Sequence, residues 1–270
     1  MNFRFSRKQL CIPYAVFLVC FVILPMLLIV FYAFTAENET GNLTFSFGNF
    51  IGFFSSPSKW QTLGVSVTIS LITTFFCVLI AYPLSYILAR SGWKKSNVLL
   101  TLFILPMWLN FVLRITALRE LLDMIGFLGN YDYVNTIIGM VYDFLPFMIL
   151  PIYTQLLKLD KTLLEASKDL GAGAFTTFTK VTLPLSMPGV YSGITMVFVP
   201  SMTNYVVSET LGNSNITILG KLIEEYFSTY ANWHMGSMIS IILLVIIFLS
   251  MLATGGFKND NENSRGSNLW

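Results

Sequence analysis

The sequence carries little charge for its length. Only 11% of its 270 residues are Asp, Glu, Lys or Arg, whereas a soluble globular domain carries about 25%. Hydrophobic residues make up 55% of the chain, and the mean hydropathy is +0.70. This composition excludes a soluble fold for most of the chain, and the net charge of +2 is too small to indicate a nucleic-acid partner.

The residues that build disulfide frameworks and metal sites are also scarce. The three cysteines, at positions 11, 20 and 77, lie singly in apolar stretches, and this spacing fits neither kind of site. His234 is the only histidine, and we expect it to be a polar residue of the membrane interface. A phosphate-binding P-loop is missing too, because Gly220-Lys221 is followed by Leu222 and has no glycine five residues earlier. We therefore expect no metal or cofactor in this chain.

Long apolar stretches are abundant instead. A helix needs about 20 apolar residues to cross a bilayer, and six stretches qualify: roughly 10–35, 63–89, 97–119, 135–157, 188–207 and 234–256. The first is too long for the apolar region of a cleaved signal peptide, so we interpret it as an uncleaved span. Because backbone groups in lipid must bond to one another, the stretches predict helices. We expect an all-α polytopic membrane protein with six transmembrane helices.

The distribution of Lys and Arg predicts the orientation of these spans. With a cytoplasmic N-terminus, twelve of the sixteen basic residues lie in cytoplasmic segments and three lie outside, at Lys59, Arg119 and Lys221. We therefore expect a multi-pass protein of the bacterial plasma (inner) membrane with both termini in the cytoplasm. We divide the chain into a cytoplasmic N-terminus (1–9), a permease-like membrane domain (10–257) and a polar cytoplasmic tail (258–270).

The cytoplasmic connection between the fourth and fifth spans, residues 158–187, has a pattern of its own. Apolar residues recur at helical spacing on both sides of Gly171: Leu163, Leu164 and Leu170 before it, and Phe175, Phe178 and Val181 after it. Glycine permits a tight bend with positive φ, and Pro184 is expected to end the second piece before the next span. The pattern predicts two short amphipathic helices, and a helix lying flat on the membrane surface is the alternative interpretation.

This connection resembles the EAA motif of ABC-importer permeases. The matching residues are Glu165, Ala166, Gly171, Ala172, Phe178, Leu183 and Pro184, with Ser167 where the motif has a second alanine. The resemblance implies the type I ABC importer (MetI-like) permease fold and a coupling helix that docks into a groove of a cytosolic ATPase dimer. In that arrangement Glu165 is a polar anchor, Gly171 is the bend, and ATP and magnesium bind to the partner ATPase.

Further segments resemble the spermidine/putrescine permeases of the PotB type. They are Leu105-Pro106-Met107-Trp108 followed by Arg114, the fourth span from Ile138 to Tyr153, and the region from Val199 to Phe227. Two departures are Ala117-Leu118-Arg119, which lacks an expected Trp, and Gly212-Asn213, which replaces a double glycine. The resemblance implies a second, homologous permease subunit, an extracytoplasmic substrate-binding protein and a polyamine substrate.

A polyamine needs carboxylates for its charges and aromatic faces for its methylenes. The predicted outer segments hold eight acidic and three basic residues, which favours attraction of cations, although the positive-inside bias alone also depletes bases there. Our candidates for the substrate path are Trp108, Asn110, Asp143, Asn204, Tyr205 and Glu209. Arg114 is a charge within a span, and it could form a purely structural ion pair with Asp143.

Other interpretations stay open at this point. Permeases for iron, thiamine, phosphonate or sulfate share the same fold and the same motif. The resemblance therefore identifies an importer more specifically than it identifies the substrate. A secondary transporter would predict inverted repeats and midplane ion ligands, neither of which is evident. A non-transporting membrane scaffold would need no coupling loop.

Overall fold

A computed structural model describes residues 12–37, 42–91, 95–129, 131–213 and 215–254, which form two compact units. The first unit comprises Met1–Gln61 and Leu222–Ile246, and the second comprises Thr62–Lys221 and Ile247–Trp270. The expected N-terminal segment 1–9 and tail 258–270 lie outside the described residues.

The first unit begins with an apolar helix and a small β-ribbon. Its elements are α1 (Ile12–Leu18), the π-helical turn η2 (Val19–Ile23), α2 (Leu24–Ala33), the antiparallel strands β1 (Thr35–Glu37) and β2 (Leu43–Phe45), and α3 (Gly48–Phe54). Strand register pairs Thr35 with Phe45. Aromatic side chains cluster here, with the Phe34 ring 5.1 Å from Phe50 and 5.7 Å from Phe47.

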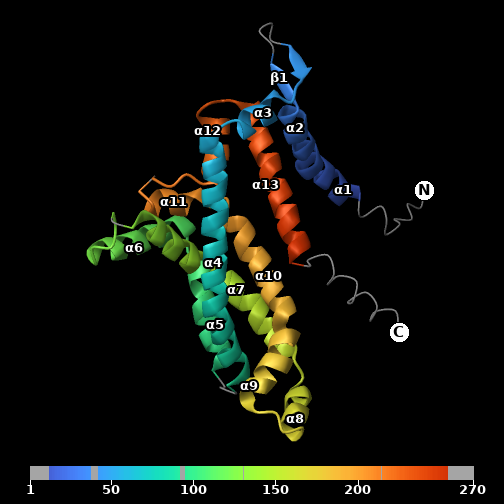
Figure 1. Ribbon diagram of the computed structural model, residues 1–270, viewed down its shortest axis with the longest axis vertical. Coiled ribbons are helices and arrows are strands. Elements are labelled where there is room, and N and C mark those ends of the chain that lie inside the picture. Colours follow the sequence, from blue (N-terminus) through green and yellow to red (C-terminus); the bar gives the residue numbers. More distant parts are fainter. Residues whose placement is uncertain (1–11, 38–41, 92–94, 130, 214, 255–270) are drawn as a thin grey trace, which may run out of the picture. The chain divides into compact units, whose positions relative to one another are not determined.

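Most of the second unit is built from long helices, labelled in Figure 1. Its elements are α4 (Pro57–Arg90), α5 (Ser96–Ile104), the 3₁₀ turn η3 (Leu105–Trp108), α6 (Phe111–Met124), α7 (Asp132–Lys158), α8 (Lys161–Asp169), α9 (Ala174–Thr177), the π turn η4 (Phe178–Thr182), α10 (Leu183–Ser201) and α11 (Tyr205–Leu211). Two further helices, α12 (Leu219–Ser228) and α13 (Trp233–Ala253), cross the unit boundary, as does the start of α4.

The six predicted spans are found, with one correction to the third. Five helices are long and apolar enough to cross a membrane, and a sixth span is the bent pair Ser96–Trp108 and Phe111–Met124. The span predicted over 97–119 is not one continuous helix, because the chain turns by 100° between these halves. Pro106 lacks a backbone donor and lies in the 3₁₀ turn, and Asn110 then accepts a hydrogen bond from the Leu113 N–H (3.2 Å) and starts α6 afresh.

The fifth span also differs from its prediction. The helix runs from Ala174 to Ser201 through Pro184, so the expectation that Pro184 ends the preceding piece is wrong. The π turn η4 precedes this proline, and the Leu183 N–H bonds to the Phe178 carbonyl five residues back. The π turn widens the backbone just before the proline ring, so the helix continues through Pro184 although this residue has no N–H to donate. The same device, a π turn before Pro25, occurs in the first span.

Tight packing of α7 against α10 forms much of the interior of the second unit. A Cβ atom added to Gly189 would lie 2.7 Å from the Pro151 carbonyl oxygen, so only glycine permits this approach. Tyr82 of α4 shares a hydrogen bond with Ser186 of α10 (2.8 Å), and Ser85 donates to the Ile149 carbonyl of α7 (3.2 Å). These contacts fix α4, α7 and α10 as one bundle.

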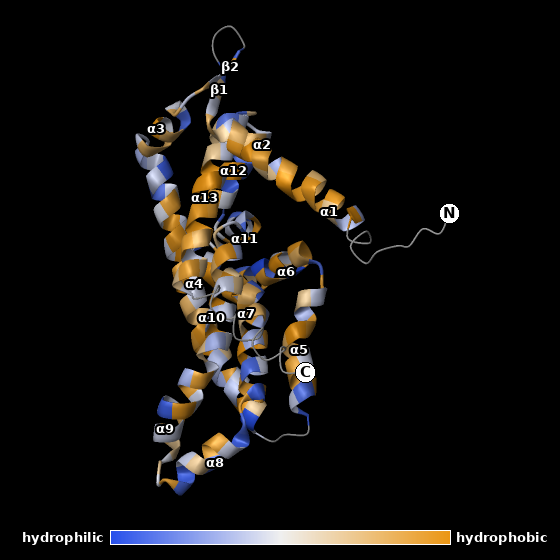
Figure 2. Cartoon of the chain, turned by 90° about the vertical axis from the view of Figure 1, so that its right-hand side faces the viewer, coloured by the Kyte–Doolittle hydropathy of each residue, from blue (hydrophilic) through white to orange (hydrophobic). Residues whose placement is uncertain are grey.

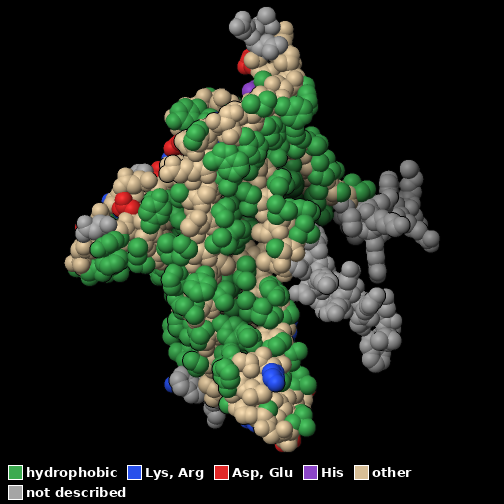
Figure 3. Space-filling model, in the orientation of Figure 1, with side chains coloured by type: hydrophobic (Ala, Val, Ile, Leu, Met, Phe, Trp, Pro, Cys, Tyr) green, Lys and Arg blue, Asp and Glu red, His purple; other side chains and the backbone are tan. Residues whose placement is uncertain are grey.

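Exposed side chains of the long helices are mostly apolar, as expected of surfaces that face lipid. None of the first span's hydrophobic window is buried, and α1 and α2 are coloured as hydrophobic along nearly their whole length in Figure 2. Hydrophobic side chains likewise dominate the visible surface of the long helices in Figure 3, whereas charged ones gather away from their middles. The all-α membrane fold is therefore confirmed, with the β-ribbon as an addition.

Candidate functional site

A buried cluster of charge lies where α6, α7 and the end of α10 meet. Arg114 of α6 forms an ion pair with Asp143 of α7, and both side chains are only 6% exposed. The other carboxylate oxygen of Asp143 accepts a hydrogen bond from the Asn204 side chain (3.1 Å). The structure thus brings together three residues that the sequence singled out separately, and it contains the predicted Arg114–Asp143 pair.

The Arg114 guanidinium has further partners that hold it in place. Its Nη1 donates to the Pro106 carbonyl (3.0 Å), and its carbon lies 5.6 Å from the centre of the Tyr142 ring. Its Nε is buried without a hydrogen-bond partner among the described residues. A charge this deep requires such a shell, because an isolated ion is costly in an apolar medium.

Two helix breaks supply the irregular backbone around this cluster. The first is the bend between η3 and α6, where the Pro106 carbonyl accepts hydrogen bonds from both the Leu109 N–H (3.1 Å) and Arg114. The second lies between α10 and α11, where Asn204 comes directly before α11 and turns its amide to Asp143. Broken helices within membrane domains bring backbone dipoles and polar side chains to one point, and such points are suited to binding polar solutes.

A second polar group follows along α11. Glu209 pairs with Lys221 (2.7 Å), whose amine also lies 5.5 Å from the centre of the Tyr205 ring. Both carboxylates among the path candidates, Asp143 and Glu209, therefore pair with a cation in this structure. Trp108 lies at the first break, and its side chain is 87% exposed.

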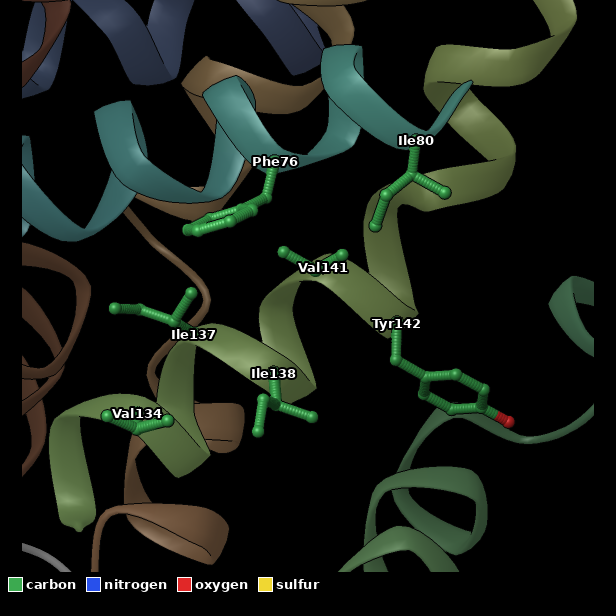
Figure 4. Close-up of a pocket in the computed structure, with 7 residues that line it drawn as sticks. All are labelled: Phe76, Ile80, Val134, Ile137, Ile138, Val141 and Tyr142. Carbon is green, nitrogen blue, oxygen red and sulfur yellow. The ribbon is translucent and has the colours of Figure 1, made fainter. Parts of the chain in front are cut away.

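An apolar pocket of the second unit does not serve as the candidate site. It has a volume of about 530 Å³ and lies between α4 and α7, lined by Phe76, Ile80, Val134, Ile137, Ile138, Val141 and Tyr142 (Figure 4). Apart from the Tyr142 hydroxyl, its lining offers no side-chain group that could orient a polar solute. Such a surface is suited to contact with lipid chains.

The coupling element, residues 158–187, is a helix–turn–helix as predicted. Asp160 caps the start of α8 by accepting from the Thr162 N–H (3.0 Å), and this backbone donor lowers the pKa of the Asp160 carboxyl. At the other end, Gly171 has φ = +79° and donates to the Lys168 carbonyl, while Ala172 donates to the Ser167 carbonyl. This pattern is a Schellman motif, which places a glycine at the position that needs positive φ.

The residues of the EAA motif divide into two sets in the structure. Phe178 and Leu183 pack against the bundle, and the Phe178 ring lies 5.4 Å from that of Tyr86. Glu165 and Ala166 are exposed. Ser167, where the motif has alanine, shares a hydrogen bond with Thr177 (2.9 Å) and so ties α8 to α9.

An apolar surface is left exposed around the Gly171 turn. Leu163 is 47% exposed, Phe175 is 80% exposed and Leu170 is 88% exposed. Since α8 and α9 otherwise carry polar exposed side chains, this surface is suited to covering by a partner. The helical spacing predicted the three residues but grouped them with Phe178, which faces inward.

Some features of the site were not foreseen from the sequence. The pairing of Glu209 with Lys221 was missed, although Lys221 is the only basic residue in the predicted outer segment 208–233. The hydrogen bond from Asn204 to Asp143 was missed as well. Pro200, four residues before Asn204, was the sequence signal for the helix break. Among the described residues no group of His, Cys, Asp and Glu could hold a metal ion. His234 instead places its Nδ1 3.0 Å from the Tyr32 carbonyl.

Comparison with known families and relatives gives consistent results. Residues 48–258 match the family described as "Binding-protein-dependent transport system inner membrane component". The chain is 34% identical to the spermidine/putrescine transport system permease protein PotB of Haemophilus influenzae over 92% of each chain. It is 33% identical to the PotB protein of Escherichia coli, over 87% of this chain and 91% of that one.

Solved structures support the same fold. A chain of a bacterial alginate ABC transporter in complex with its alginate-bound periplasmic protein superposes with a TM-score of 0.73 at 14% identity, over 94% of this chain and 93% of that one. A chain of the MetNI methionine ABC transporter in an inward-facing conformation gives a TM-score of 0.56 at 20% identity, over 75% of this chain and 96% of that one. At these identities the likeness concerns the fold alone.

Proposed function

The chain belongs to the family of inner-membrane components of binding-protein-dependent transport systems, and on this premise we propose that it is the permease subunit of an ABC importer for polyamines. It is a multi-pass protein of the inner membrane. The observation that carries the substrate class is the similarity to PotB proteins, which covers nearly the whole of both chains. ATP hydrolysis takes place on a partner ATPase dimer, and a second permease subunit completes the path.

The proposed path passes the Arg114–Asp143–Asn204 cluster. A polyamine is a flexible cation with several ammonium groups, and a carboxylate binds such a group through a charge-assisted hydrogen bond. An ammonium group would exchange for the protein's own cation, because Asp143 pairs with Arg114 and Glu209 pairs with Lys221 in this structure. Asp143 lies at both helix breaks, and Trp108 and Asn110 flank the first of them. Glu209 and Tyr205 continue the polar surface from Asn204, so that successive ammonium groups meet successive carboxylates.

Uptake of labelled spermidine by cells expressing the complete importer tests the path. We expect Asp143→Asn to reduce uptake at least tenfold, and Glu209→Gln to reduce it less, because Glu209 is more exposed. The double variant Arg114→Met with Asp143→Asn controls for folding, since it leaves no unpaired charge. Wild-type uptake in the combined Asp143→Asn and Glu209→Gln variant would contradict this path.

The range of substrates needs a separate test. Spermidine uptake is measured against excess putrescine, iron(III), thiamine, phosphonate and sulfate. We expect competition by putrescine alone, because the path candidates are carboxylates and aromatic rings. Uptake of one of the other solutes, with none of either polyamine, would place the chain with another importer of the same fold.

Coupling to the ATPase is proposed to occur through α8 and α9. The exposed apolar residues Leu163, Leu170 and Phe175 form the docking face, and Glu165 lies beside it as a polar anchor. Docking on an apolar helical face in a groove is a common mode of helix recognition. This places the coupling element and both termini in the cytoplasm, with the binding protein on the other side of the membrane.

Retention of the ATPase on purified permease measures the coupling. Leu170→Glu with Phe175→Glu is expected to abolish retention without lowering the melting temperature, because both side chains face outward. The matched control, Leu170→Met with Phe175→Leu, keeps the apolar surface and should retain the ATPase. Glu165→Arg and Gly171→Val are expected to weaken retention too, and unchanged retention and transport in all of these variants would contradict the coupling assignment.

A further inference from the structure

A basic pocket separates the coupling element from the end of α4. It has a volume of about 440 Å³ and is lined by Tyr86, Arg90, Lys161, Leu164, Glu165, Lys168, Ala174, Thr177 and Thr182. Three cations therefore face one carboxylate. The pocket is within the size range of sites for small molecules.

The charges of this pocket are not neutralised within the described part of the chain. No carboxylate there forms an ion pair with Arg90, Lys161 or Lys168. The Arg90 Nη2 donates only a long hydrogen bond to the Leu159 carbonyl (3.4 Å), and its Nε is buried with no partner among the described residues. A guanidinium has five donors, so Arg90 has donors left over for an anion.

The position of the pocket indicates where that anion comes from. Tyr86 and Arg90 lie in the last turns of α4, which also carry the exposed apolar residues Ile80 and Ile87. An aromatic residue followed by a cation at the end of a span is typical of the headgroup level of a bilayer. The pocket thus adjoins both the apolar surface of the span and the water-exposed coupling element.

The pocket is also distinct from the proposed docking face. Lys161, Leu164, Glu165 and Lys168 recur at intervals of three and four residues and so share one side of α8, and all four line the pocket. Leu163, Leu170 and Phe175 do not line it. The two sites share only Glu165, so the apolar docking face stays accessible when a ligand occupies the pocket.

We propose that this pocket binds the phosphodiester of an anionic phospholipid of the cytoplasmic leaflet. Arg90 and the two lysines hold the phosphate, and the acyl chains lie along the apolar side of α4. Basic pockets between membrane helices on the cytoplasmic side favour such headgroups. The bound lipid braces the coupling element against the end of α4.

Lipid retention by the full-length chain in detergent tests this site independently of transport. Native mass spectrometry and the melting temperature are followed with added dioleoylphosphatidylglycerol, with dioleoylphosphatidylcholine and with inorganic phosphate alone. We expect phosphatidylglycerol to be retained and to raise the melting temperature, with neither of the other two additives doing so. Lys161→Gln with Lys168→Gln should weaken phosphatidylglycerol binding by about 30-fold, since each lysine near an anionic surface contributes roughly fivefold.

The matched control is Lys158→Gln with Lys180→Gln, which removes the same charge from exposed positions outside the pocket and should retain the lipid. Equal phosphatidylglycerol binding by both double variants would overturn the site. An equal response to inorganic phosphate would mean that the pocket binds a free anion and not a lipid. Loss of ATPase retention in the Lys161→Gln/Lys168→Gln variant with unchanged lipid binding would make the pocket a contact for the ATPase instead.

Discussion

The two polar regions of this permease, the buried charge cluster and the coupling element, satisfy their charges in opposite ways. Arg114 and Asp143 are nearly inaccessible, and they find partners in each other, in Asn204 and in the Pro106 carbonyl. The coupling element leaves Lys161 and Lys168 without an ion pair in the described chain, as the adjoining end of α4 leaves Arg90, and it leaves Leu170 and Phe175 exposed. The buried cluster pairs its charges within the chain, so loss of either partner should destabilise the fold. The coupling element does not, so its state should depend on what binds to it.

The buried pair gives the largest expected effect. Arg114→Met leaves Asp143 buried without a countercharge, and we expect it to lower the free energy of unfolding by about 3–5 kcal/mol, as when one partner of a buried pair is removed. The double variant Arg114→Met with Asp143→Asn should recover most of this loss. Thermal unfolding in detergent measures both.

Arg119→Met is the control, because Arg119 lies on the same helix and forms no ion pair among the described residues. It should unfold close to the wild-type temperature. If Arg114→Met also unfolded near the wild-type temperature, the buried Arg114–Asp143 pair would contribute no more to stability than a surface pair. The buried cluster would then not differ from the coupling element in this respect.

Packing around glycine gives the next effect. Gly189→Ala places a Cβ 2.7 Å from the Pro151 carbonyl oxygen, so α7 and α10 must move apart. We expect a loss of about 1–3 kcal/mol, as for overpacked cores. The same change at Gly173, in the coupling element, meets no atom within 4 Å at φ = −67° and should be nearly neutral in the same melting assay.

Both regions were visible in the sequence, for different reasons. The coupling element was predicted well because its signals are local: Gly171 supplies the positive φ and Leu163, Leu170 and Phe175 have helical spacing. The cluster was only partly predicted, since Asn204 and Asp143 lie 61 residues apart and the backbone breaks that bring them together are not periodic. Hydropathy located a span over 97–119 but not its 100° bend, because it measures apolarity and not direction.

The different outcomes at Pro106 and Pro184 have a common physical origin. Proline removes one donor, but the surrounding backbone decides whether the helix bends or continues. At Pro106 the chain forms a 3₁₀ turn and bends, whereas at Pro184 a preceding π turn leaves the helix unbroken. The sequence marks both positions as special without specifying which outcome occurs.

A smaller, local effect is expected at the Gly171 turn. Gly171→Ala forces an L-residue to φ = +79° in open space, which costs about 1–2 kcal/mol. Because the strain lies at the end of α8, we expect faster hydrogen exchange in α8 and little change in the melting temperature. A fall in the melting temperature as large as that of Gly189→Ala would mean that the coupling element is part of the folding core.

The smallest effect concerns the start of α8 and depends on pH. The Thr162 N–H lowers the pKa of Asp160, so the ionised cap stabilises the folded element above the ordinary Asp range, near pH 4. This contribution is lost as the pH falls through the lowered pKa. The Thr162 amide resonance should therefore titrate with a midpoint below that of Asp in an unstructured peptide.

Asp160→Asn separates the cap from its charge. Asparagine caps helices about as well as aspartate but does not titrate, so the Thr162 amide should keep its capped chemical shift and lose the acidic transition. Asp160→Ala should lose both. A transition that persisted in the asparagine variant would assign the titration to another carboxylate, and α8 would then owe its start to something other than this cap.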